Sequence, residues 1–266
     1  MALTFLETEK RDTTGIIWFN APPANGLNLD LVEEFAQVVA GFREEQRTIR
    51  CLILASRLEG VFIAGADIKM IKRYMEGSNL VDDMVHFNTR LQHTINQVED
   101  LPFPVISAIN GHAMGGGLEL ALACDFRFMA KGKARVGLPE VNLGLLPGAG
   151  GTQRLSRLIG KSIAKDIIYN RRFLDAEDAL TMGMIDRAYE PEVLLDECLA
   201  YAEKFKDQAG VAISVVKGCI NKGLELPLAD GLALEMRGLE TLLNTTDARE
   251  GVGAFLEKRK PLFTGR

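Results

Sequence analysis

Hydrophobic and polar positions follow two periodicities along the chain, one typical of strands and one typical of helices. The segments "LTFLETEK" (residues 3–10) and "GIIWFN" (residues 15–20), joined by the turn-like "RDTTG", predict a strand pair. Apolar residues that recur at helical spacing predict amphipathic helices near residues 30–42 and 80–98. The apolar sets are Leu31, Phe35, Val38, Val39 and Phe42 in the first helix and Leu80, Met84, Phe87, Leu91, Ile95 and Val98 in the second.

Three short apolar runs predict further strands. "CLILAS" (residues 51–56) and "PVISAI" (residues 104–109) are continuous enough to be buried strands, and "FRFMA" (residues 126–130) follows them. Beyond residue 151 the pattern is mainly helical. Strands interleaved with helices over the first two thirds indicate an α/β core. We expect an α/β catalytic core at residues 1–195 and a helical C-terminal region at residues 196–266.

Composition and charge narrow the class of protein. The 266 residues are 47% hydrophobic and 25% charged, and the net charge of −5 gives no support for nucleic-acid binding. The four cysteines are far apart without a CxxC pair and there are only three histidines, so we expect buried thiols and no metal site. Glu7 and Glu9 interrupt any signal peptide, and no apolar run is long enough to cross a bilayer. A cytoplasmic protein is the simplest expectation.

The glycine-rich stretches do not match nucleotide-binding motifs. "GKS" at residues 160–162 has Leu155 where a phosphate-binding loop requires glycine. "GAGG" at residues 148–151 has Gln153 at the third dinucleotide position, and "GGGLEL" has Leu120 there. Chemistry that depends on NAD or ATP is therefore disfavoured.

A single carboxylate stands out in "GHAMGGGLELALACD" (residues 111–125). Glu119 is the only charged side chain from Met114 to Cys124, and no residue three or four positions away can form an ion pair with it. We expect Glu119 to point inward with a raised pKa, which suits general acid–base catalysis. The alternative is a core glutamate paired with a distant Arg or Lys.

The glycines before Glu119 predict exposed backbone donors. A helix start offers N–H groups without internal partners, so the Gly116 N–H can stabilise an oxyanion. A second N–H, near Ala66, is expected from the turn in "FIAGADIK" (residues 62–69). Tight strand–helix packing at the glycines and a plain turn at Ala66 are the structural alternatives.

A second carboxyl candidate is Glu140, in the loop "GLPEVNLGLLPGAGG". It follows Pro139 among glycines and apolar residues, and catalytic groups concentrate on such loops. A solvated loop glutamate is the alternative. Two carboxyls in one site would have their pKa values driven apart, which gives one acid and one base.

Taken together, four segments resemble the crotonase superfamily, and most of all its enoyl-CoA hydratases. They are "FIAGADIK", "AINGHAMGGGLELALACDFR", "GLPEVNLGLLPGAGGTQRL" and "REGVGAFLEKRKPLF", in the order and spacing of that family. The resemblance implies a spiral of β-β-α units with a helical C-terminal region that builds homotrimers, commonly paired into hexamers. It also implies a lyase that hydrates trans-2-enoyl-CoA to 3-hydroxyacyl-CoA in fatty-acid or related acyl-CoA breakdown.

The resemblance further implies roles for individual residues. Glu119 and Glu140 match the two catalytic glutamates, and the N–H groups of Ala66 and Gly116 match the oxyanion hole. Contacts with the substrate and its coenzyme A are implied for Ala24, Ala64, Asp67, Ile68, Lys69, Leu118, Pro139, Gly148, Phe255 and Lys258. Coenzyme A belongs to the substrate, so no separate cofactor and no metal are implied, and neither nucleic acid nor membrane is an expected partner.

The sequence departs from the common family pattern in two segments, and two alternatives to the hydratase function stay open. "NAPPANGLN" and "IKMIKRYM" differ from the commonest family forms and bear on acyl-chain preference. Within the family the alternative is a double-bond isomerase, which often needs one carboxyl only. From another class, the alternative is a non-catalytic or RNA-binding member. The hypothesis of RNA binding is disfavoured because the predicted helix at residues 80–98 carries Asp82 and Asp83 and only Arg90 as a full positive charge.

Overall fold

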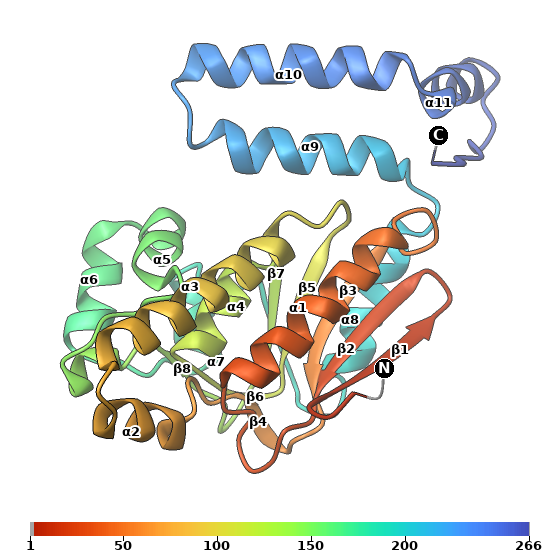
Figure 1. Ribbon diagram of the computed structural model, residues 1–266. Coiled ribbons are helices and arrows are strands. Elements are labelled where there is room, and N and C mark those ends of the chain that lie inside the picture. Colours follow the sequence, from red (N-terminus) through yellow and green to blue (C-terminus); the bar gives the residue numbers. More distant parts are fainter. Residues whose placement is uncertain (1–2, 266) are drawn as a thin grey trace.

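Two sheets organise the protein, whose computed structural model describes residues 3–265 (Figure 1). The larger sheet has the strand order β1-β2-β3-β5-β7-β9 and the smaller one the order β4-β6-β8. The larger sheet contains β1 (Leu6–Arg11), β2 (Thr14–Phe19), β3 (Cys51–Ser56), β5 (Val105–Ile109), β7 (Phe126–Ala130) and β9 (Arg187–Tyr189). The smaller sheet contains β4 (Gly60–Ile63), β6 (Gly111–Met114) and β8 (Val136–Gly137).

The two sheets are built by one repeating unit. In each repeat a strand of the large sheet is followed by a strand of the small sheet and then by a helix or a 3-10 turn. The repeats are β3-β4 followed by α2 (Ile68–Glu76), β5-β6 followed by α4 (Gly116–Ala123), and β7-β8 followed by the 3-10 turn η1 (Glu140–Leu143). Strands of successive repeats pair in parallel in both sheets, whereas β1 and β2 form an antiparallel hairpin. The predicted spiral of β-β-α units is therefore confirmed. Because the repeats stack, the loops after β4, β6 and β8 come to one place.

The helices and short 3-10 turns lie around this framework. They are α1 (Leu29–Glu44), α2 (Ile68–Glu76), α3 (Leu80–Glu99), α4 (Gly116–Ala123), η1 (Glu140–Leu143), α5 (Gly151–Ile159), α6 (Lys161–Tyr169), α7 (Ala176–Thr181), α8 (Leu194–Ala202), η2 (Glu203–Phe205), α9 (Gly210–Gly223), α10 (Leu228–Leu243) and α11 (Thr246–Leu256). The apolar stripes predicted for α1 and α3 face the core, since Phe35, Val39, Leu91 and Ile95 are all buried. The helix α4 is buried along its whole length and has no polar face.

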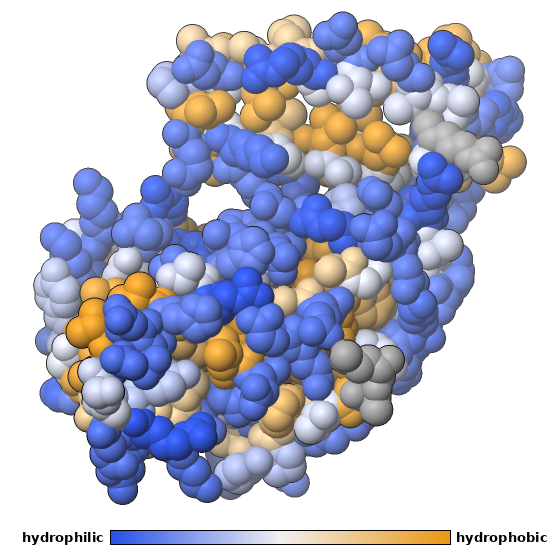
Figure 2. Space-filling view, viewed as in Figure 1, coloured by the Kyte–Doolittle hydropathy of each residue, from blue (hydrophilic) through white to orange (hydrophobic). Residues whose placement is uncertain are grey.

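The helical C-terminal region projects from the core as a separate arm (Figure 1). The division predicted between residues 195 and 196 falls inside α8, and α8 packs on β3, β5 and β7 of the large sheet. The arm itself consists of α9, α10 and α11, and many of its large apolar side chains are exposed in the single chain (Figure 2). They include Val216, Ile220, Leu232, Met236, Leu239, Leu243, Val252, Phe255 and Leu256.

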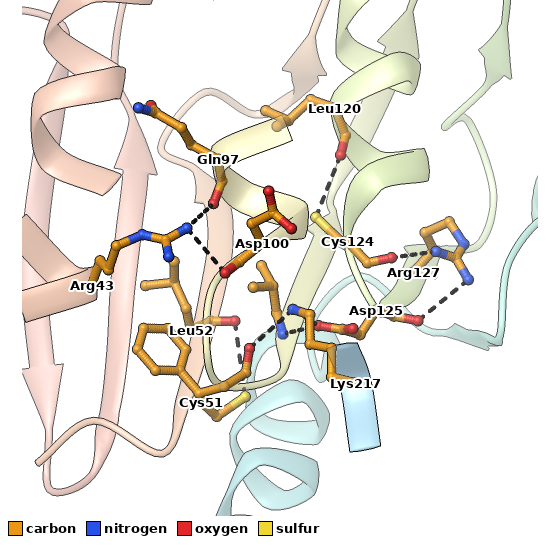
Figure 3. Close-up of polar contacts among 12 residues, drawn as sticks. Arg43, Cys51, Leu52, Gln97, Asp100, Leu120, Cys124, Asp125, Arg127 and Lys217 are labelled. Carbon is orange, nitrogen blue, oxygen red and sulfur yellow. Dashed lines mark hydrogen bonds and ion pairs between the residues drawn. The ribbon is translucent and has the colours of Figure 1, made fainter. Parts of the chain in front are cut away.

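A partly buried ion pair fastens the arm to the core (Figure 3). The Lys217 ammonium of α9 donates to the Asp125 carboxylate at 2.7 Å and to the Phe103 carbonyl at 3.2 Å. Asp125 also accepts the Val105 N–H at 2.7 Å, and the neighbouring Arg127 guanidinium donates to the Cys124 carbonyl at 2.7 Å. These contacts fix the corner at which α4 ends and β7 begins. Along the described chain, no helix is both long and apolar enough to span a membrane.

Candidate active site

A cavity of about 830 Å³ lies where the loops after β4, β6 and β8 meet α3. The four residues predicted to be catalytic, Ala66, Gly116, Glu119 and Glu140, all line it. The predicted substrate contacts Ala64, Ile68, Pro139 and Gly148 line it as well. Segments separated by more than seventy positions in the sequence thus form one site, because the stacked repeats bring equivalent loops together.

Two glycines allow the loops after β4 and β6 to touch. Gly65 has a φ of +102° and Gly115 a φ of +52°, in the region that favours glycine. A Cβ on Gly65 would lie 3.1 Å from the Met114 carbonyl oxygen, and one on Gly115 would lie 3.8 Å from the Gly65 Cα. The residues that follow these glycines, Ala66 and Gly116, are therefore held side by side at the cavity wall.

The N–H groups of Ala66 and Gly116 are free to bind a ligand. The bridge between Leu27 and Ala66 uses the Leu27 N–H, which donates to the Gly65 carbonyl, and the Asp67 N–H, which donates to the Leu27 carbonyl, both at 2.8 Å. Gly116 is the first residue of α4, so its N–H has no partner in the helix. Neither N–H has an acceptor within residues 3–265. Two such donors facing one cavity can stabilise an oxyanion.

Glu119 is held by backbone donors at the start of α5. The side chain is only 2% exposed, and its Oε1 accepts the Ala149 N–H at 2.7 Å and the Gly151 N–H at 2.8 Å. Burial raises the pKa of Glu119 to about 7, and the nearby charge of Glu140 raises it too, whereas the two backbone N–H groups oppose the shift. No Lys or Arg of the described chain forms an ion pair with Glu119, so the predicted inward carboxyl is observed without a salt bridge.

Glu140 enters the same cavity from the opposite loop. It is the first residue of η1, and its Oε1 would lie 2.6 Å from a Cβ on Gly115. Its Oε2 is buried and has no hydrogen-bond partner within the described part of the chain. Burial raises the pKa of Glu140 as well. The two carboxyls therefore share one poorly solvated space, and each disfavours the ionisation of the other.

We expect Glu119→Gln to stabilise the fold at pH 8 but not at pH 4.5. The carboxyl has an ordinary pKa of 4.5 and a folded pKa of about 7, so the folded protein binds the proton more tightly. The free energy of unfolding contributed by Glu119 therefore falls as pH rises from 4.5 to 7 and is constant above 7. A shift of this size corresponds to about 3 kcal/mol. Glutamine removes the charge and keeps an oxygen for the Ala149 and Gly151 N–H groups.

Urea unfolding of wild type and Glu119→Gln at both pH values measures this effect. The exposed Glu59, which has no ion-pair or hydrogen-bond partner in the described chain, supplies the control Glu59→Gln. The control should not change the free energy of unfolding at either pH. If the difference in the free energy of unfolding between Glu119→Gln and wild type is the same at pH 4.5 and pH 8, the buried charge of Glu119 does not destabilise the fold.

Six other predicted contacts lie outside the cavity lining. The Ala24 carbonyl accepts the Ala64 N–H at 3.1 Å, which ties the "PPANGLN" loop to the site. Asp67 caps α2 by accepting the Lys69 and Met70 N–H groups, and Lys69 is exposed. Leu118 is fully buried in the hydrophobic core, so its side chain does not take the predicted place in the substrate site. Phe255 and Lys258 belong to the C-terminal arm, and Phe255 is 80% exposed.

The structure adds residues that the sequence reasoning missed. Asn88 and Gln92 of α3 line the cavity, and the Gln92 amide donates to the Gly148 carbonyl at 2.5 Å. Asn88 donates to the Met84 carbonyl at 2.9 Å. Asn88 and Gln92 are four positions apart, which places them on one face of α3 beside the apolar stripe. This spacing is the sequence signal that could have identified them as cavity residues. Leu145 and Leu146, from the loop after η1, add apolar side chains to the lining of the cavity.

Comparisons with known proteins relate this chain to enzymes over nearly its whole length. The sequence model of the family described as Enoyl-CoA hydratase/isomerase matches residues 9–266. An enoyl-CoA isomerase/hydratase of Mycosarcoma maydis is 39% identical over 100% of this chain and 98% of its own. The mitochondrial methylglutaconyl-CoA hydratase of Homo sapiens is 38% identical over 98% of this chain and 76% of its own. The crystal structure of an enoyl-CoA hydratase from Bacillus anthracis superposes with a TM-score of 0.91 at 37% identity, covering 99% of this chain and 100% of that one.

Proposed function

Because the chain belongs to the enoyl-CoA hydratase/isomerase family, we propose that it adds water across the double bond of a trans-2-enoyl-CoA to give the 3-hydroxyacyl-CoA. The observation that carries this proposal is the pair of carboxyls in one cavity, Glu119 buried and Glu140 half-buried, both with raised pKa values, beside two N–H groups that have no acceptor in the described chain. The reaction would belong to fatty-acid or related acyl-CoA breakdown. Coenzyme A enters as part of the substrate.

In the proposed reaction the thioester oxygen accepts hydrogen bonds from the Ala66 and Gly116 N–H groups. Negative charge develops on this oxygen when the hydroxyl of water bonds to the β-carbon and the electrons of the double bond move toward the thioester. Glu119 and Glu140 position that water and take its proton, and a proton is delivered to the α-carbon. The Oε1 of Glu119 is already occupied by the Ala149 and Gly151 N–H groups, which leaves Oε2 to act on water.

The second carboxyl favours hydration over isomerisation. Moving a double bond needs one base that shuttles a proton, whereas hydration must also orient a water molecule. Glu140 is half-buried and lines the same cavity as Glu119, and its Oε2 has no hydrogen-bond partner within the described part of the chain. Such an arrangement suits the binding of a water between two carboxyls. An enoyl-CoA isomerase remains the second candidate.

The C-terminal arm would complete the site in a homotrimer or a dimer of trimers. Many of its large apolar side chains are exposed in the single chain, and apolar side chains gathered on one surface mark an interaction site. In such an assembly Phe255 and Lys258 of a neighbouring copy would reach the coenzyme A, and Lys69 at the start of α2 would face its phosphates. The positive charges would stabilise the bound nucleotide.

Loss of the absorbance of a conjugated enoyl thioester tests the proposed function. The substrates should be short, medium and aromatic trans-2-enoyl-CoA thioesters together with 3-methylglutaconyl-CoA. We expect a decrease with at least one of them, and mass spectrometry should show that the product has gained one water. A stable absorbance with every substrate would refute the proposal.

A further inference from the structure

Arg154 connects the α5 end of the candidate active site to α3. It is the fourth residue of α5 and its side chain is only 15% exposed. Its guanidinium donates to the Glu99 carboxylate through Nε at 3.2 Å and through Nη2 at 2.5 Å, and Nη2 also donates to the Asn96 amide oxygen at 2.6 Å. Two sides of the guanidinium fork are thus fixed by two residues of one helix turn of α3.

The third side of the guanidinium lies against the segment that holds Glu119. Nη1 donates to the Ala149 carbonyl at 3.4 Å, and a Cβ on Gly150 would lie 2.2 Å from the same atom. Gly150 has a φ of +113°, so the segment of residues 149–151 turns sharply under the guanidinium. The two N–H groups that bind Glu119 come from the residues on either side of Gly150.

We propose that Arg154 is a positioning residue, which fixes the turn at residues 149–151 against α3 so that the Ala149 and Gly151 N–H groups hold Glu119 in its reactive orientation. The proposal rests on the proposed function for its kinetic consequences but not for its structural ones. Arg154 does not touch the carboxyl of Glu119, and it acts through the backbone between them.

Few charged groups face Glu119 and Arg154. Glu140 lines the same cavity as Glu119, the charges of Glu140 and Arg154 both act on Glu119, and Glu99 of α3 is the carboxylate paired with Arg154. The positive charge of Arg154 lowers the pKa of Glu119, and so do the two N–H groups that it keeps in place. Replacement of Arg154 removes its positive charge and releases the turn that holds the two N–H groups, and both changes raise the pKa of Glu119. The pKa of Glu119 must therefore rise further when Arg154 is replaced.

Three variants separate this role from a general contribution to stability. Arg154→Met removes the charge and the fork, and Arg154→Lys keeps the charge without the planar fork. Arg157→Met is the matched control, because Arg157 lies on the same helix and is exposed. Within residues 3–265 it pairs only with the exposed Glu225 and with Gln153. Circular dichroism and urea unfolding would establish that all three variants are folded.

With an enoyl-CoA substrate we expect Arg154→Met to lower kcat by about 10- to 100-fold, because a small displacement of a catalytic group has effects of that order. KM should change far less than kcat. The acid limb of the pH profile should move to higher pH by about one unit. Arg154→Lys keeps the charge but not the fork, so it should recover only part of the position of the acid limb and part of kcat, and Arg157→Met should resemble wild type in both.

An infrared titration of the Glu119 carboxyl gives a readout that does not need turnover. Protein labelled with 13C-glutamate is titrated, and the spectrum of the equally labelled Glu119→Gln variant is subtracted in each background. We expect a higher pKa of Glu119 in Arg154→Met than in Arg157→Met. If the two variants show the same Glu119 pKa, the proposal is overturned, whether or not hydration is detected. If wild type does not hydrate any enoyl-CoA but the pKa rises as expected, only the proposed function fails.

Discussion

Glu119→Gln is expected to lower the turnover of a trans-2-enoyl-CoA by about 10²- to 10⁴-fold, the usual contribution of acid–base catalysis. Glutamine has nearly the same shape and can still accept the Ala149 and Gly151 N–H groups, but it cannot take a proton from water. The fold should be retained, because the buried charge is unfavourable at neutral pH. Steady-state kinetics from the loss of enoyl-thioester absorbance measure the effect.

Glu140→Gln should cause a loss in the same range, and the double variant should lose little more than the worse single variant. Groups that act as a unit on one water give strongly non-additive effects. Glu59→Gln, on the surface, is the control and should keep full turnover. Turnover within about twofold of wild type in either single variant would contradict the assigned roles of the two carboxyls.

Gly116→Pro is expected to lower kcat by about 10²- to 10³-fold, because it removes one donor from the proposed oxyanion hole. Gly116 is the first residue of α4, and proline is well tolerated at the first position of a helix. Its N–H has no acceptor within residues 3–265, so the folded protein loses no internal hydrogen bond. KM should change little, since the donor acts mainly on charge that develops in the transition state.

Gly116→Ala is the matched control for the proline variant. A Cβ at this position would lie 2.7 Å from Cδ1 of Leu27, the end of a flexible side chain, and both variants add this atom. Alanine keeps the N–H, so most of the activity should return. Equal losses in Gly116→Ala and Gly116→Pro, measured on variants with the far-ultraviolet circular dichroism of wild type, would mean that crowding and not the missing donor is responsible.

Local patterns in the sequence were sufficient to predict most of the elements around the site. The apolar run at residues 51–56 is the buried strand β3, and the predicted stripe of α3 is buried from Phe87 to Val98, whereas Leu80 at the start of the helix is exposed. The isolation of Glu119 predicted an inward carboxyl, because no neighbour on its own helix could solvate or pair with it. These predictions succeeded because the signals lie within one or two turns of the same element.

The contacts that cross the fold could not be predicted in this way. The Ala149 and Gly151 N–H groups that hold Glu119 lie thirty or more positions further along, and Arg154 pairs with Glu99, fifty-five positions away. Leu118 was predicted to contact the substrate because it lies next to Glu119 in the sequence. Its side chain is instead buried in the hydrophobic core, since α4 is buried on every side. Which side chain reaches the cavity depends on how the repeats stack, and no local pattern records that.

Incubation of the wild-type protein with a trans-2-enoyl-CoA in water enriched in ¹⁸O tests the central claim most directly. If Glu119 and Glu140 direct water onto the β-carbon, mass spectrometry will show a 3-hydroxyacyl-CoA with one ¹⁸O at carbon 3, and this product will be nearly absent with Glu119→Gln. An unlabelled product whose double bond has moved to carbon 3 would instead identify an isomerase. Such a result would contradict the proposal that the two carboxyls share a water.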